Sequence, residues 1–210
     1  MNGKAIKSYI LAAFFTVLAL AGCARKPRNP IVEALVTAVV WASGADEDRV
    51  YITKLEQLRK VTVGEELDYR ISLFEYKLKR DTGHYLYYKE SNMPRNAARF
   101  AAWVAQDNRI LASLDSLRMN LDDGTAARVA FYEFKFSAKA ESPDYVFNIK
   151  DWHFIITPRY KILAMKQNGT GIRRGMGKLI PGYMTVLGHE EMTEEDMERQ
   201  LSWNRDRIPR

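Results

Sequence analysis

The sequence predicts an α+β protein with a curved, mostly antiparallel sheet of four to six strands and one long helix packed on it. Residues 127–138 show the alternation of a strand, with Ala130, Tyr132, Phe134 and Phe136 on one side, and residues 145–157 and 160–167 are two further predicted strands. Short turn signals connect these segments, so neighbouring strands are expected to run antiparallel. Before them, residues 95–117 carry apolar side chains at three- and four-residue steps, the period of an amphipathic helix.

An N-terminal helix is expected over residues 31–42. Asn29 and the proline after it form a helix start, and Gly44 is a helix stop. The segment between them is almost entirely apolar, which predicts a buried helix covering the sheet, while its β-branched residues leave a strand as the alternative. Residues 49–53 and 61–63 are short strand candidates, and the segment between them is compatible with a helix.

A β-hairpin is expected over residues 67–90. Apolar side chains fall at alternate positions from Leu67 to Leu73. The Arg-Asp-Thr-Gly sequence at 80–83 has the composition of a turn, and the aromatic run at 84–88 is typical of a second strand. These two strands would extend the sheet ahead of the long helix.

The long helix over 95–117 is expected to bury Phe100 and Leu111 against the sheet, because both lie on its apolar stripe. Aromatic side chains occur on both faces of the later strands, since Phe131 alternates with Tyr132. A curved sheet with helices on its concave side would use aromatic residues in this way. Such an arrangement resembles the cone of NTF2-like or cystatin-like domains, which leaves a cup between helix and sheet.

The C-terminal part, residues 168–210, is expected to be a glycine-rich basic loop followed by a helical tail. The loop would present Arg173, Arg174 and Lys178, and these three side chains are candidates for binding an anion. Their spacing does not match a phosphate-binding loop, and the alternative is a solvated basic surface. The tail is expected to be capped by Thr193, because acidic residues fill the turn that follows.

No catalytic or metal-binding motif stands out in the sequence. His84, His153 and His189 lack the spacing of metal ligands, and no serine lies in a Gly-x-Ser-x-Gly sequence. Clustered carboxylates lie at predicted turns, where they have a structural reason to be. We therefore expect a protein without enzymatic activity, cofactor or metal.

The first 23 residues differ from the rest of the chain. Two lysines precede an apolar run over residues 10–20, which is shorter than the ~18–20 residues that a membrane-spanning helix needs. A basic start, a short apolar segment and small residues make a secretory signal peptide. The sequence Leu20-Ala21-Gly22-Cys23 resembles the lipobox of bacterial lipoproteins, in which the cysteine is acylated and becomes the first residue.

This resemblance implies a location for the protein and a membrane anchor. Residues 1–22 would be the signal peptide, acyl chains on Cys23 would hold the protein on a membrane, and residues 23–30 would form a basic tether to an α+β domain over 31–167. In such lipoproteins an aspartate after the cysteine tends to retain the protein in the inner membrane. Here that residue is Ala24, so the resemblance implies the outer membrane, with the protein facing the periplasm or the cell surface.

Composition adds limits on function. The full chain has a formal net charge of +6, and without the two lysines of the expected signal peptide the charge would be +4, which is mild, so nucleic-acid binding is not expected. The single cysteine leaves no disulfide for the folded part. We expect a lipoprotein of the cell envelope that binds a protein partner there. The alternatives are a carrier of an apolar ligand in a helix–sheet cup and a cell-wall hydrolase, and a cleft in which His84 or His153 approaches a carboxylate would favour the hydrolase.

Overall fold

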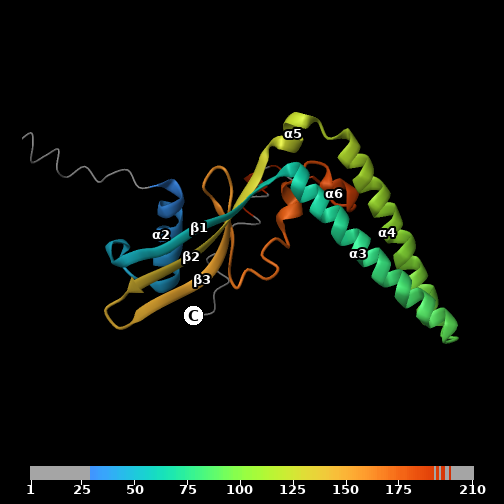
Figure 1. Cartoon of the computed structure of the whole chain (residues 1–210), viewed down its shortest axis with the longest axis horizontal. Coiled ribbons are helices and arrows are strands. Elements are labelled where there is room, and N and C mark those ends of the chain that lie inside the picture. Colours follow the sequence, from blue (N-terminus) through green and yellow to red (C-terminus); the bar gives the residue numbers. More distant parts are fainter. Residues whose placement is uncertain (1–28, 192, 194, 197–198, 200–210) are drawn as a thin grey trace, which may run out of the picture.

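The computed structural model describes residues 29–191 together with residues 193, 195, 196 and 199. It is an α+β structure with two parts that meet at an angle (Figure 1). The first part is a four-stranded antiparallel sheet with the strand order β1-β2-β3-β4. The second part is a pair of long antiparallel helices, α3 and α4, which projects away from the sheet and is here named the helical hairpin.

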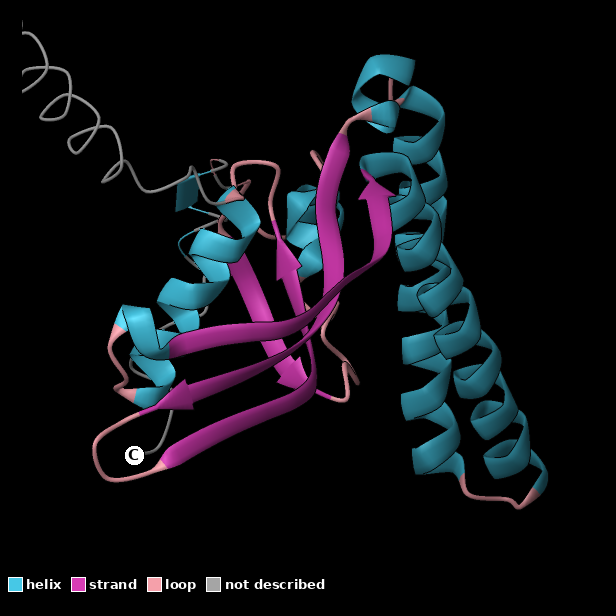
Figure 2. Cartoon of the chain, turned by 60° about the vertical axis from the view of Figure 1, so that its left-hand side comes forward, coloured by secondary structure: helices cyan, strands magenta, loops and turns pink. Residues whose placement is uncertain are grey.

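The sheet confirms the expected antiparallel meander. Its strands are β1 (Val50–Thr62), β2 (Val129–Glu141), β3 (Val146–Ile156) and β4 (Ile162–Gln167). Where two short strand candidates were expected, β1 is one continuous strand, because it pairs with β2 along its whole length. Figure 2 shows β1 and β2 continuing to the base of the helical hairpin, which is inserted between them in the sequence.

The N-terminal segment forms α2 (Pro30–Ser43), so the helix is confirmed and the strand alternative is wrong. The side chain of Asn29 accepts a hydrogen bond from the Ile31 amide at 2.9 Å. Gly44 ends the helix in a left-handed conformation with φ 68°, which glycine adopts without strain. One face of α2 packs on the sheet, where Leu35 and Val39 join a cluster of phenylalanines from β2 and β3.

The expected β-hairpin over residues 67–90 is wrong, because this segment lies within one helix, α3 (Val63–Glu90). A capping box starts the helix: the Glu65 amide donates to the Thr62 hydroxyl at 3.2 Å, and the Thr62 amide donates to the Glu65 carboxylate at 2.7 Å. The turn expected at 80–83 is helical. Pairing with the next long helix gives α3 a partner along most of its length.

The long helix is confirmed as α4 (Pro94–Asn120), but its expected packing on the sheet is wrong. Phe100 is buried against α3, with its ring 5.0 Å from the His84 ring and 5.4 Å from the Tyr88 ring. Leu111 is half-buried. Only the C-terminal end of α4 reaches the sheet, where Leu114 lies in the same cluster as buried residues of β2 and β3.

The junction between the sheet and the hairpin holds a second core, and the C-terminal segment is part of it. The buried residues that this segment contributes are Ile172, Met176, Leu179, Ile180 and Tyr183. They include parts of two short helices, η2 (Met176–Leu179) and α6 (Tyr183–Val186), and another short helix, α5 (Asp123–Ala127), precedes β2. The segment is irregular, as expected, but it is docked in the core and is not a solvated loop. Beyond it, Thr193 accepts a hydrogen bond from the Asp196 amide at 3.1 Å, which agrees with the expected cap.

Candidate functional site

The first of the three candidate anion-binding residues, Arg173, points into the protein. Its guanidinium binds the Glu66 carboxylate, with Nε donating to Oε2 at 3.1 Å and Nη2 also in contact. The guanidinium also lies 4.0 Å from the centre of the Tyr69 ring. Glu66 is on the first turn of α3 and is completely buried. Arg173 therefore holds a carboxylate of its own chain.

A second arginine completes this arrangement, here named the Glu66 network. Arg70 donates to Glu66 Oε1 from Nε at 2.8 Å and from Nη2 at 2.5 Å. It also donates to the backbone carbonyls of Arg173 and Arg174, at 2.5 Å and 3.3 Å. These bonds fix the C-terminal segment to the base of α3. Because two arginines share one carboxylate, the network leaves a surplus positive charge in the junction.

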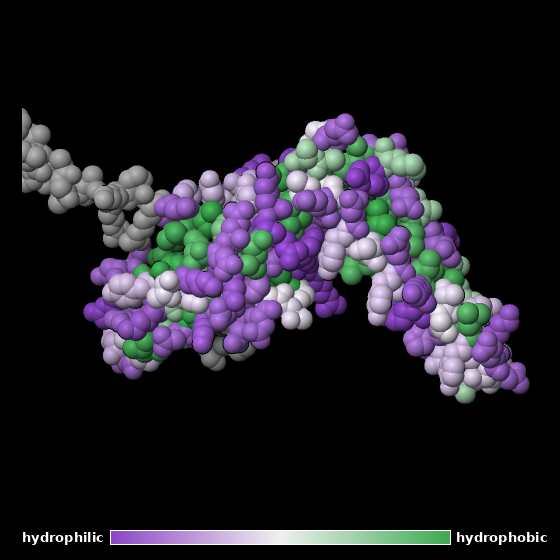
Figure 3. All heavy atoms as spheres, in the orientation of Figure 1, coloured by the Kyte–Doolittle hydropathy of each residue, from purple (hydrophilic) through white to green (hydrophobic). Residues whose placement is uncertain are grey.

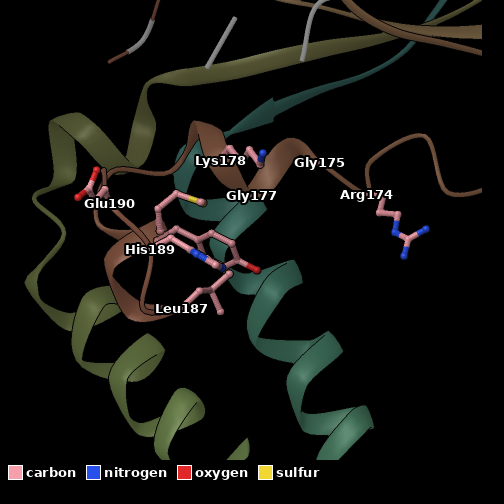
Figure 4. Close-up of a pocket in the computed structure, with 9 residues that line it drawn as sticks. Arg174, Gly175, Gly177, Lys178, Leu187, His189 and Glu190 are labelled. Atoms are coloured by element: carbon pink, nitrogen blue, oxygen red, sulfur yellow. The ribbon is translucent and has the colours of Figure 1, made fainter. Parts of the chain in front are cut away.

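The other two candidate residues, Arg174 and Lys178, line a pocket of about 530 Å³ beside the network, here named the junction pocket (Figure 4). His189 lies on its wall as well and comes from a different segment, after α6. No pattern in the sequence connects this histidine with the basic residues. In Figure 4 the Arg174 side chain reaches away from the other lining side chains. The apolar part of the wall is formed by Met184, Leu187 and the ring of Tyr183.

Close backbone contacts hold the junction pocket in shape. A Cβ on Gly177 would lie 2.8 Å from Cε1 of Tyr183 and 3.0 Å from Nε of Arg70, so only glycine allows this approach. The segment after α6 is held by Glu191, which accepts hydrogen bonds from the Thr185 amide and hydroxyl at 2.9 Å and 3.0 Å. Burial raises the pKa of the Tyr183 hydroxyl, although the charge of Arg70 opposes this, so the hydroxyl stays protonated at neutral pH.

A buried polar cluster interrupts the apolar seam of the helical hairpin. Asp81 on α3 and Asp107 on α4 are 1% and 2% exposed. Lys77 donates to Asp81 at 3.0 Å and to both oxygens of Asp107 at 2.7 Å and 2.6 Å, and Arg80 donates to Asp81 at 3.0 Å. Polar groups at seam positions are satisfied only in one alignment of the two helices, so this cluster sets their register.

We expect this cluster to make the hairpin sensitive to acid. Burial alone would raise the pKa of Asp81, but hydrogen bonds from Arg80 and Lys77 lower it below its ordinary value. A carboxyl group whose pKa is lower in the folded protein than in the unfolded chain stabilises the fold at pH values above its unfolded pKa of about 3.9. This stabilisation is lost as the pH falls through the pKa of the folded state. Burial alone would lower the pKa of Lys77, but hydrogen bonds to Asp107 and Asp81 raise it, so its contribution is lost only above about pH 10.4.

Urea unfolding of the wild type and of Asp81→Asn measures this effect. At about pH 7 the variant should be less stable by about 1–3 kcal/mol, the range for a hydrogen bond to a charged group. At about pH 3 the difference should shrink, because Asp81 of the unfolded wild-type chain binds a proton below its unfolded pKa of about 3.9, which favours unfolding of the wild type. An equal difference at both pH values would contradict the role of the charged carboxylate.

An aromatic cluster lies near the free end of the hairpin, at a distance from both cores. It consists of His84, Tyr88, Arg99, Phe100 and Trp103, and is here named the tip patch. The Arg99 guanidinium lies 5.2 Å from the Trp103 ring and 5.4 Å from the Phe100 ring. Trp103 is 39% exposed. Figure 3 shows hydrophobic groups on the hairpin between hydrophilic ones, on the face turned to the viewer.

The sequence pattern does not indicate the tip patch, because the aromatic run at 84–88 favours a strand. A strand at these residues would not place Tyr88 beside the helix that carries Trp103. The usable signal was the capping box at Thr62 and Glu65, since it starts a helix whose length brings residue 88 beside residue 100. Phe100 itself lay on the expected helical stripe.

One histidine approaches a carboxylate, as the hydrolase alternative requires. Nδ1 of His153 lies 3.4 Å from Oε1 of Glu133, and Glu133 also pairs with Arg59 at 3.0 Å. The backbone covers this histidine, however, because a Cβ on Gly169 would lie only 2.7 Å from Nδ1 of His153. The pair therefore lies against the backbone of the turn at Gly169. The described contacts of His84 include Tyr88 and Phe100 in the tip patch.

An apolar ligand would need a cavity between helix and sheet. A hollow of about 270 Å³ lies beside α2, with Trp41 and Tyr160 in its wall, and it is smaller than the ~300–1,000 Å³ of most small-molecule sites. Within residues 29–191 and the four described residues beyond them, no group of three or more His, Cys, Asp or Glu could hold a metal ion. None of the helices in this described part of the chain combines the length and apolar character of a membrane span. Cys23 and the expected signal peptide lie outside the described residues.

Comparisons with known protein families, with curated proteins and with solved structures gave no match for this chain.

Proposed function

We propose that this protein is an outer-membrane lipoprotein of the cell envelope, anchored through Cys23, which binds a protein partner through the tip patch. The observation that carries the proposal is the exposed pair Trp103 and Arg99, beside the half-buried Tyr88, near the free end of a projecting hairpin. These three residue types dominate the binding energy of protein interfaces. Within the chain, the tip patch supports neither of the two cores.

The expected anchor fits this arrangement. Between Cys23 and Pro30, where α2 begins, lie six residues, which span at most about 20 Å even when fully extended. The sheet would therefore stay close to the membrane surface. In Figure 1 α2 and the free end of the hairpin lie on opposite sides of the junction. Anchoring at one end would leave the tip patch accessible to a partner.

The anchor is tested by Cys23→Ser. Since the serine has no thiol to acylate, we expect the variant to lose lipid attachment and to remain soluble or unprocessed. Metabolic labelling with a fatty-acid analogue measures the attached lipid. Equal labelling of the wild type and the variant would contradict an anchor at Cys23.

Partner binding is tested by photo-crosslinking in intact cells. A photoreactive residue at position 103, within the tip patch, should crosslink to one envelope protein repeatedly. The matched control is position 76 on α3, where Tyr76 is 69% exposed but lies outside the tip patch. The same crosslinked proteins at both positions would indicate chance encounters along the hairpin and would contradict the proposal.

A further inference from the structure

We infer that the junction pocket binds an organic anion, namely a phosphate monoester or carboxylate attached to an apolar group. This site is separate from the tip patch and does not depend on a partner there. The charge of the pocket is the first argument. Its wall holds the ammonium group of Lys178 and the imidazole of His189 beside one carboxylate, that of Glu190, and Arg174 lines its rim with a side chain that reaches away from them.

The Glu66 network adds to this charge from behind the pocket. Arg70 and Arg173 share one carboxylate, and the Nε of Arg70 would be 3.0 Å from a Cβ on Gly177, a residue of the pocket wall. The surplus positive charge therefore lies directly under the wall. Because the network is buried, it is screened less than charges on the surface. Lys178 comes from η2 and His189 from the segment after α6, so two separate segments form the wall of the pocket.

The apolar part of the wall specifies the rest of the ligand. Met184, Leu187 and the ring of Tyr183 line the same pocket as the basic groups. A small inorganic ion would leave these apolar groups in water, whereas an alkyl or aryl substituent would cover them. The volume of about 530 Å³ is within the range of small-molecule sites.

The pocket is formed before any ligand arrives. The segment that carries Arg174 and Lys178 is fixed by the burial of Ile172, Met176 and Leu179 and by the hydrogen bonds from Arg70. A glycine with φ 80°, Gly182, lets the chain turn against Leu117 on α4. A site whose walls are already ordered loses little conformational entropy on binding.

The test uses the full chain in vesicles of phosphatidylcholine, with hexyl phosphate as the probe and equilibrium dialysis as the measurement. Hexyl phosphate should bind, and Lys178→Gln combined with His189→Gln should weaken its binding by about tenfold or more. Lys150→Gln, which removes an exposed positive charge on β3, is the matched control and should bind as the wild type does. Circular dichroism checks that all variants are folded.

Two further probes separate the parts of the inference. Hexylammonium has the same apolar group and the opposite charge. If it bound as tightly as hexyl phosphate, the inference that the pocket requires an anion would be overturned. If inorganic phosphate bound as tightly as hexyl phosphate, the inference that the ligand carries an apolar group would be overturned. Equal hexyl phosphate binding by the wild type and the double variant would overturn the assignment to this pocket.

The source of the anion is decided by a second arm. Part of the phosphatidylcholine is replaced by phosphatidylglycerol, and the thermal unfolding midpoint of the chain is compared with that in neutral vesicles. If phosphatidylglycerol raises the unfolding midpoint of the wild type but not that of the double variant, the pocket binds a lipid head group and its chain. If the midpoint does not rise although free hexyl phosphate binds, the pocket binds a soluble amphiphile.

Discussion

Glu66→Ala should lower the free energy of unfolding by about 3–5 kcal/mol, because it leaves two arginines without their carboxylate in a buried place. Glu66 is completely buried, Arg70 is 6% exposed, and the side chain of Arg173 is 16% exposed. Water therefore has little access to replace the lost hydrogen bonds. Urea unfolding at neutral pH, followed by circular dichroism, measures the change.

Two other variants make this result specific. Glu75→Ala removes an exposed carboxylate from the same helix and should change stability by less than about 0.5 kcal/mol. Glu66→Gln keeps an oxygen that can accept from one arginine, so its cost should be smaller than that of alanine. A loss of less than about 1 kcal/mol for Glu66→Ala would show that the network does not hold the C-terminal segment on the hairpin.

The Glu66 network also explains why Arg173, Arg174 and Lys178 do not have the same role in the structure. From the sequence they share a glycine-rich segment and look equivalent. In the structure Arg173 binds Glu66, while Arg174 and Lys178 line the junction pocket. The two ends of the Glu66–Arg173 contact are 107 residues apart in the sequence. No local pattern connects such residues, so only the fold reveals the pair.

The sheet was predictable because its strands follow the simplest pattern. In β2 the alternate residues Phe134 and Phe136 are buried under α2, and period-two alternation marks such a face directly. The first strand was harder to recognise. β1 lies at the edge of the sheet, and its middle is exposed and carries charged side chains such as Lys54 and Arg59. An edge strand of this kind has no buried face along its centre to mark it.

The helix α3 is hard to recognise in the sequence, because the spacing of its first apolar residues fits both a strand and a helix. Leu67 and Ile71 fit an alternating strand, but they also fit a helical seam that continues with Phe74 and Leu78. The turn-like composition at 80–83 then favoured two strands. Gly83 is exposed in the helix, and a Cβ there would meet nothing within 4 Å, so the helix tolerates it at a cost of about 1 kcal/mol. Packing against α4 outweighs that local preference.

The proposed function makes a quantitative prediction about Trp103. Its exposed ring is flanked by the Arg99 guanidinium at 5.2 Å and by the Phe100 ring at 4.8 Å. A tryptophan in the centre of an interface typically contributes 2 kcal/mol or more of binding free energy, which corresponds to about thirtyfold in affinity. Trp103→Ala should therefore weaken partner binding by about thirtyfold, and the midpoint of thermal unfolding controls for folding.

The most direct test titrates the envelope protein crosslinked from position 103 against three purified full-length proteins: the wild type, Trp103→Ala and Tyr76→Ala. Tyr76 is the matched control, because it is an aromatic residue of the same hairpin, 69% exposed and outside the tip patch. We predict that Trp103→Ala lowers the affinity by about thirtyfold while Tyr76→Ala leaves it unchanged. Equal affinities for all three proteins would contradict the claim that the tip patch is the partner-binding surface.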